Sequence, residues 1–118
     1  PQISPRKREA FSTYYWTHKH YFDQVTAAGH LKTSNNKIEL VAITTEEHLD
    51  TLRKEISNET VRDSTDTDII IACWVHTKNE LIEGYKSGDE YYKRIIDKLT
   101  IILDDDNIFP EIMETITL

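Results

Sequence analysis

The segment DIIIACWVHTKNELIEGYKSG, residues 68–88, decides the fold of this chain. Its first half is a run of β-branched and apolar residues, which predicts a strand buried on both faces at residues 68–75. Thr77 and Glu80 then match the capping box that opens a helix, and Gly88 suits the helix end. A strand that leads directly into a helix brings free amide N–H groups and the positive end of a helix dipole to one point. Such a point favours the binding of a phosphate.

Strands and helices alternate on both sides of this segment. Before it, residues 38–43 (IELVAI) predict another strand buried on both faces, and Thr44 with Glu47 matches a second capping box. Elsewhere we expect, in chain order, a short strand near residue 61, a helix at 89–98, a buried strand at 99–103, a turn at 104–107 and a helix at 109–116. This alternation predicts an α/β fold in which helices flank a parallel sheet.

The first 36 residues are predicted to form a separate unit. Ser4-Pro5 is typical of a helix start, and aromatic residues then recur at spacings of three and four towards Gly29. This pattern predicts one long amphipathic helix with an aromatic face, which ends at the glycine and is followed by a polar connector. We therefore divide the chain into an N-terminal helix and connector, residues 1–36, and an α/β domain, residues 37–118.

The composition narrows the class of protein. A length of 118 residues with 38% hydrophobic residues is sufficient for one domain with one core. The single cysteine, Cys73, lies in the apolar run and is expected to be buried, and its neighbour Trp74 is expected in the core or in helix packing. No disulfide framework is therefore possible, which fits a reducing compartment such as the nucleus or cytosol. The sequence has no secretory or membrane-spanning apolar stretch, so we expect no membrane partner.

The net charge of −7 is unevenly distributed along the chain. Residues 1–37 carry six basic and two acidic residues, a balance of +4, which leaves −11 for the remainder. An acidic body lacks the dense basic face that nucleic acids require, so DNA binding by this domain is not expected. Arg6, Lys7 and Arg8 lie near the start of the predicted helix, where the dipole disfavours cations. They are either solvated charges or auxiliary charges beside a binding site.

The sequence shows little sign of catalytic chemistry. Asp104-Asp105-Asp106 follows a predicted strand, and Asp104 with Asp106 would be the Mg²⁺ ligands of a small enzyme. Such a site needs further carboxylates from neighbouring strand ends, whereas the first predicted strand ends in Thr44-Thr45. Acidic residues before a helix more often form turns and interact with the helix dipole. No histidine has a partner at ligand spacing. We therefore predict no catalytic residue, metal or cofactor, and keep the Mg²⁺-dependent enzyme as an alternative.

The order of elements over residues 37–118 resembles the BRCT domain, a phosphopeptide-binding module of nuclear repair and chromatin proteins. The family's third strand often has the pattern T-H-L-I-V/A, and residues 67–72 (TDIIIA) are similar. The family's second helix often opens with Thr-x-Lys, where this chain has Thr77-Lys78. Members of the family end with a strand, a turn and a helix that carries a large aromatic residue, and the end of this chain is similar. Three features differ: a glycine pair is missing, Phe109 stands where most members have Trp, and residues 89–98 look like an insertion. With a long helix in front, the chain is similar to the helix-BRCT modules of yeast heterochromatin scaffolds.

The resemblance implies a four-stranded parallel sheet, a nuclear location and a non-enzymatic role in transcriptional silencing, as at telomeres. It implies as partners phosphorylated Ser/Thr peptides of nuclear and chromatin proteins, with Thr44, Thr45 and Lys78 holding the phosphate. A hydroxyl donor, an ammonium group and a helix N-terminus are suited to this chemistry. The alternative interpretation is that Thr44 and Thr77 only cap helices and that Lys78 is a solvated charge. The remaining alternative is a structural domain that docks or self-associates through its aromatic helix.

Overall fold

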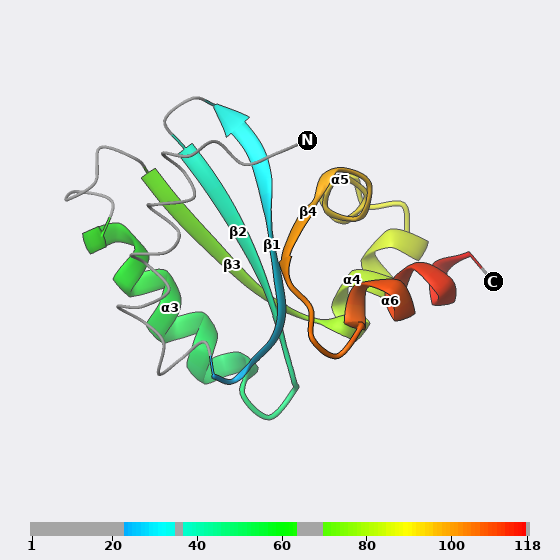
Figure 1. The fold of residues 1–118 in the computed structure, drawn as a ribbon, viewed down its shortest axis with the longest axis horizontal. Helices are drawn as coiled ribbons and strands as arrows, with labels where there is room; N and C mark the ends of the chain where they lie inside the picture. Colours follow the sequence, from blue (N-terminus) through cyan, green and yellow to red (C-terminus); the bar gives the residue numbers. More distant parts are fainter. Residues whose placement is uncertain (1–22, 35–36, 64–69, 118) are drawn as a thin grey trace.

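The computed structural model of the chain is described over residues 23–34, 37–63 and 70–117. These residues form a four-stranded sheet of strand order β3-β2-β1-β4 with helices on both faces (Figure 1). The strands are β1 (Val25–Ser34), β2 (Lys37–Thr44), β3 (Ile70–Thr77) and β4 (Thr100–Leu103), and the helices are α3 (Leu49–Asp63), α4 (Lys78–Lys86), α5 (Glu90–Lys98) and α6 (Ile108–Ile116). The α/β class and the flanking helices agree with the prediction.

The sheet is mixed, so the expected all-parallel arrangement is wrong. Only β2 and β3 run parallel, whereas β1 is antiparallel to both of its neighbours, β2 and β4. The reason lies in the length of the connections. Helix α3 provides the long crossover that parallel strands require, whereas Ser34 at the end of β1 already pairs with Lys37 at the start of β2. A connection this short permits only an antiparallel hairpin.

The prediction that the first helix continues to Gly29 is wrong, because residues 25–34 form strand β1. Gly29 is therefore not a helix cap. A Cβ atom at this position would lie 2.7 Å from Leu99 Cγ and 2.8 Å from the Thr100 carbonyl oxygen, so the glycine permits β4 to approach closely. Strand β1 precedes the proposed domain boundary at residue 37, yet it lies inside the same sheet. Residues 1–22 of the predicted helix, including Arg6-Lys7-Arg8, lie outside the described residues.

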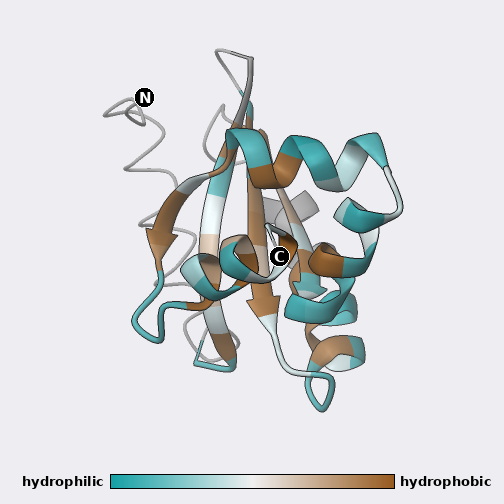
Figure 2. Cartoon of the chain, turned by 90° about the vertical axis from the view of Figure 1, so that its right-hand side faces the viewer, coloured by the Kyte–Doolittle hydropathy of each residue, from teal (hydrophilic) through white to brown (hydrophobic). Residues whose placement is uncertain are grey.

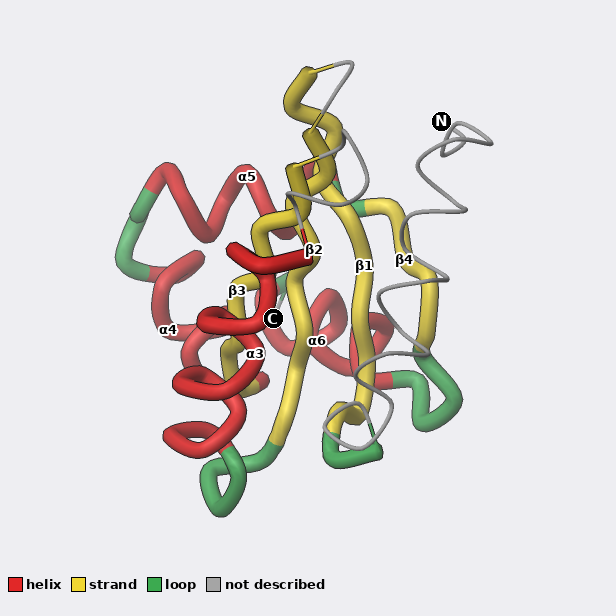
Figure 3. Tube along the Cα trace, turned by 90° about the vertical axis from the view of Figure 1, so that its left-hand side faces the viewer, coloured by secondary structure: helices red, strands yellow, loops and turns green. Residues whose placement is uncertain are grey.

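The sheet separates two hydrophobic clusters. Figure 3 shows α3 packed against one face of the sheet, over β2 and β3. Figure 2 shows the opposite face, where hydrophobic residues of the strands lie beneath the other helices. One cluster combines Leu52 and Ile56 of α3 with Ile38, Leu40, Ala42, Ile71, Cys73 and Val75. The other combines α4, α5 and α6 with Val41 and Ile43 of β2 and with Ala27 and Leu31 of β1. Strand β2 is buried on both faces, as its near-continuous apolar sequence predicts.

The structure corrects three further expectations. Residue 61 lies in α3, which extends to Asp63, so the short strand expected there is wrong. Strand β3 is not buried on both faces as predicted, because it lies at the edge of the sheet, where Ile70 is 48% exposed and Trp74, expected in the core or in helix packing, is 44% exposed. Strand β4 was expected to be buried, but it lies at the edge of the sheet, where Ile101 is 49% exposed. The predicted helices at 89–98 and 109–116 are confirmed within a residue as α5 and α6.

Candidate functional site

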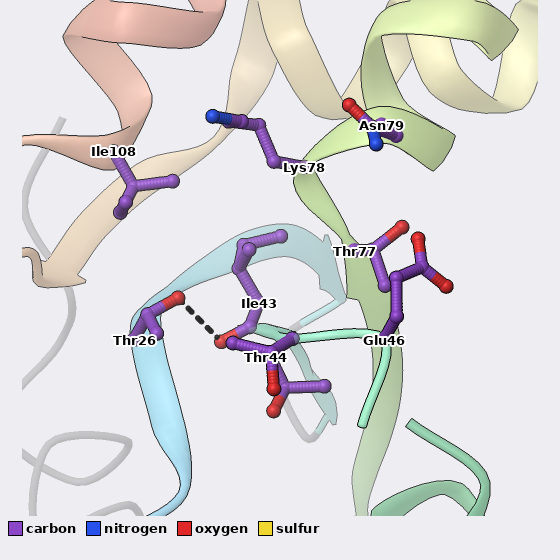
Figure 4. Close-up of a pocket in the computed structure, with 9 residues that line it drawn as sticks. Thr26, Ile43, Thr44, Glu46, Thr77, Lys78, Asn79 and Ile108 are labelled. Atoms are coloured by element: carbon purple, nitrogen blue, oxygen red, sulfur yellow. Dashed lines mark hydrogen bonds between the residues drawn. The ribbon is translucent and has the colours of Figure 1, made fainter. Parts of the chain in front are cut away.

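The parallel strands β2 and β3 end side by side, because Thr44 pairs with Thr77. In open α/β sheets, ligands bind beyond the carboxyl ends of such strands. A cavity with a volume of about 210 Å³ lies at this point, and Figure 4 shows the residues that line it. Its walls come from the strand ends, the segment after β2, and the starts of α4 and α6: Thr26, Ile43, Thr44, Thr45, Glu46, Thr77, Lys78, Asn79 and Ile108.

The three residues predicted to hold a phosphate meet at this cavity. Thr44 is the last residue of β2, Thr45 follows it, and Lys78 is the first residue of α4. They converge because the α3 crossover brings β3 alongside β2 in the same direction, so both strands end at one edge. The proposed auxiliary cations at positions 6–8 lie outside the described residues.

The start of α4 is held by the capping box expected from the sequence. The Thr77 side chain accepts a hydrogen bond from the Glu80 amide at 3.1 Å, and the Glu80 carboxylate accepts one from the Thr77 amide at 3.1 Å. The helix itself has no acceptor for the first-turn amides of Lys78 and Asn79. Both residues line the cavity. The first turn of α4, with the positive end of its dipole, therefore forms part of the cavity wall.

The Lys78 ammonium adds positive charge at the same edge. Its side chain extends toward α6 in Figure 4, and its Nζ lies 2.7 Å from Glu111 Oε1. Both side chains are partly solvated, with relative exposures of 37% for Lys78 and 53% for Glu111. The cation is therefore accessible from the cavity, but it is paired with a carboxylate of its own chain.

The two threonines after β2 differ in their hydrogen bonding. The buried Thr44 hydroxyl donates to the Gln24 carbonyl at 2.7 Å, and the Thr26 hydroxyl donates to the Ile43 carbonyl at 3.0 Å. These bonds tie the end of β2 to the start of β1. The expected Thr44–Glu47 capping box is wrong, because Thr44 is still paired in the sheet and α3 begins only at Leu49. Thr45, in contrast, is exposed, follows the end of β2 and lines the cavity.

Behind the capping box lies a polar network that sequence reasoning missed. Arg53 Nη2 of α3 donates to both Glu80 oxygens, at 2.9 and 3.1 Å, and also to the Val75 carbonyl at 2.9 Å. His76 Nδ1 lies 3.2 Å from Glu80 Oε1, and its Nε2 lies 2.7 Å from the Tyr91 hydroxyl. The spacing of four between His76 and Glu80, across a strand-to-helix junction, was the available signal. The other two members of the network, Arg53 and Tyr91, are remote in sequence, so no local pattern pointed to them.

The pKa directions define the charges in this network. Burial lowers the pKa of His76, against the opposing effect of its hydrogen bond to Glu80. Burial acts to raise the pKa of Glu80, but hydrogen bonds from the Thr77 amide and from Arg53 outweigh it, so this pKa is lowered. Burial raises the pKa of Tyr91 to about 12. At neutral pH a protonated Tyr91 thus donates to a neutral His76, which donates to the Glu80 carboxylate. The network orients the start of α4.

The acidic segment after β4 has a structural role. Asp104 accepts hydrogen bonds from the amides of Ile108 at 2.6 Å and Phe109 at 3.0 Å, so it caps α6. The interpretation of this segment as a turn with a helix-dipole partner is confirmed for Asp104. Over residues 23–34, 37–63 and 70–117, no group of three or more His, Cys, Asp or Glu side chains is placed to hold a metal ion.

Comparisons with known proteins give no assignment. No family model, curated protein or solved structure matches this chain significantly. In the part of the chain that the structure describes, no helix combines the length and the apolar character needed to cross a membrane.

Proposed function

We propose that this chain is a non-enzymatic module that binds phosphorylated Ser or Thr side chains of partner peptides at the cavity between β2 and α4. One observation carries the proposal: Thr45, after β2, and Lys78, in the first turn of α4, line the same cavity. The hydroxyl and the ammonium group come from separate elements and converge on the end of a helix that favours anions.

The cavity offers a set of donors suited to a phosphate dianion. Its lining residues carry the Thr45 hydroxyl, the Lys78 ammonium and, in Lys78 and Asn79, two first-turn amides that have no acceptor within α4. Bonds from charged donors to phosphate oxygens are shorter and stronger than neutral ones. Thr44, whose hydroxyl is bonded to Gln24, acts in this proposal by fixing the strand end that presents Thr45.

The size of the cavity also favours a single modified side chain. Sites for drug-sized ligands and cofactors have volumes of about 300–1,000 Å³. A cavity of about 210 Å³ is smaller than this range, but it is sufficient for a phosphate group with part of its side chain. We infer that the rest of the peptide lies across the surface around the opening.

The BRCT resemblance supports the biological part of the proposal. The succession β2-α3-β3-α4, with a threonine after the first of these strands and a lysine opening α4, follows the family's order. The antiparallel β1 departs from the family's all-parallel sheet. On this basis we propose phosphorylated nuclear and chromatin proteins as partners, with a nuclear location and a role in silencing.

A titration with matched peptides tests the proposal. A degenerate library of phosphoserine and phosphothreonine peptides first selects a binding sequence, and calorimetry then compares this peptide with its unphosphorylated twin. We expect binding of the phosphorylated peptide, weakened at least tenfold without the phosphate. Equal affinity for the two peptides contradicts phosphate recognition.

A second candidate function is docking or self-association without phosphate recognition. The observation that favours it is the exposure of Ile70 (48%) and Trp74 (44%) on β3, the strand at one edge of the sheet. The aromatic helix predicted from the sequence, the original basis for this alternative, falls on residues 1–22, which lie outside the described residues. Analytical ultracentrifugation over a wide concentration range tests it, because a protein that stays monomeric throughout argues against self-association.

A further inference from the structure

We propose that the phosphorylated peptide carries a lysine or arginine close to its modified residue, and that Glu46 binds this cation. The inference rests on the proposed function and specifies its partner class: a peptide that is basic around the phosphorylation site. The observation that carries it is a second charge in the cavity, opposite in sign to Lys78.

Glu46 lines the cavity and has no bonding partner among the residues that the structure describes. It is exposed, and its carboxylate forms no hydrogen bond or ion pair within the described parts of the chain. The neighbouring Glu47 differs, because its carboxylate lies 4.0 Å from His48 and it does not line the cavity. In Figure 4, Glu46 lies beside Thr77, whereas the Lys78 side chain extends away toward α6. The cavity thus has a cationic side and a separate anionic side.

The local charge balance disfavours a ligand that is purely anionic. A phosphate bound beside Lys78 is attracted by one ammonium group. It is repelled by two carboxylates, that of Glu46 in the cavity wall and that of Glu111, which is paired with Lys78. A cavity this small is narrower than the Debye length of about 8 Å at physiological salt, so these repulsions are not screened out. A cation next to the phosphate converts the Glu46 repulsion into an attraction, while Lys78 and the α4 amides still bind the phosphate.

The charge of the whole domain acts in the same direction. The chain carries a net charge of −7, and its acidic residues are concentrated after residue 37. A field of this sign slows the approach of acidic peptides and accelerates that of basic ones. Local contact and long-range steering therefore favour the same partner, a phosphopeptide with basic flanks.

Binding measurements with a pair of peptides, one with arginine and one with glutamine at a flanking position, and with three protein variants test the inference. The probe is a phosphopeptide from the library selection, prepared with arginine or with glutamine at one flanking position at a time. Wild type, Glu46→Gln and the matched control Glu47→Gln are titrated with each peptide, and thermal melts check that the folds are equally stable. At the best position we expect wild type and Glu47→Gln to prefer arginine by about two- to fivefold, the range for an exposed ion pair. Glu46→Gln should lose this preference.

The outcomes separate this inference from the proposed function. If binding requires the phosphate but wild type shows no arginine preference, or Glu46→Gln keeps it, the role of Glu46 is overturned and phosphate recognition stands. If no peptide gains affinity from its phosphate, the proposed function fails, and the inference fails with it. If Glu47→Gln loses the preference as fully as Glu46→Gln, the effect is long-range steering and the contact is disproved.

Discussion

The Lys78 ammonium lies 2.7 Å from the Glu111 carboxylate, and this pair joins the first residue of α4 to the first turn of α6. The residue proposed to bind a phosphate is therefore already bound by an anion of its own chain. Exposed ion pairs of this kind contribute only about 0–1 kcal/mol. A phosphate that also bonds to the α4 amides can displace the Glu111 carboxylate.

Glu111→Gln should therefore raise the affinity for the phosphorylated peptide by about two- to fivefold, because the competing carboxylate is removed. Calorimetric titration measures the change. Glu114→Gln is the matched control, since it removes the same charge from an exposed position of the same helix. If both variants bind equally, the effect is one of overall charge, and competition by Glu111 is disproved.

Lys78→Met should lose about tenfold or more of the affinity for the phosphorylated peptide, because a hydrogen bond to a charged group contributes about 1.5–3 kcal/mol. Its affinity for the unphosphorylated twin should not change, and its melting temperature should shift little because the ion pair with Glu111 is exposed. Lys86→Met, in the last turn of α4, is the control and should bind as wild type does. A Lys78→Met protein that still distinguishes the two peptides would contradict the site.

Arg53→Gln should lower the free energy of unfolding by about 1–2 kcal/mol, because the Val75 carbonyl loses a partly buried hydrogen bond and Glu80 loses an exposed one. Urea denaturation measures the loss. Lys54→Gln, an exposed neighbour in α3, should be nearly neutral. A loss no larger than that of Lys54→Gln would show that the network does not stabilise the fold.

The stability of the protein should decrease as the pH falls below about 6.5. The pKa of His76 is lower in the folded state than its ordinary value, so the unfolded chain binds more protons in this range. The stabilisation from neutral His76 is complete above the unfolded pKa and is lost in acid, and the lowered pKa of Glu80 extends the loss to lower pH. Melting temperatures measured from pH 8 to pH 5 follow this change.

His76→Gln should flatten the pH profile between about pH 6.5 and pH 5, even if the variant is less stable throughout. His48→Gln, which replaces a more exposed histidine, should leave the profile of wild type intact. The assignment to His76 is wrong if its replacement leaves the slope unchanged.

Asp104→Ala should destabilise the fold by about 1 kcal/mol through loss of the α6 cap, whereas Asp105→Ala and Asp106→Ala should be nearly neutral. Melting curves with and without Mg²⁺ test the enzyme alternative in the same experiment. We expect Mg²⁺ to leave the melting temperature of wild type unchanged. A Mg²⁺-dependent rise that disappears in Asp106→Ala would favour a metal site instead.

The local signals of the sequence predicted the elements that build the site. The apolar runs of β2 and β3 predict strands, and the Thr77–Glu80 box determines where α4 begins. These features depend on neighbours in the chain, so they can be inferred without coordinates. A long crossover between two parallel strands also implies that both end at one edge of the sheet, where Thr45 and Lys78 follow them.

The sequence alone determined the strands β2, β3 and β4 and the helices α4, α5 and α6, because these follow from local periodicity and capping. The tertiary structure decided the rest. Residues 25–34 carry a pattern compatible with a helix, and only pairing with both β2 and β4 makes them a strand. The partners of Lys78 and Glu80 were also undetermined, because Glu111 and Arg53 reach them only after α6 and α3 have packed on opposite faces of the sheet.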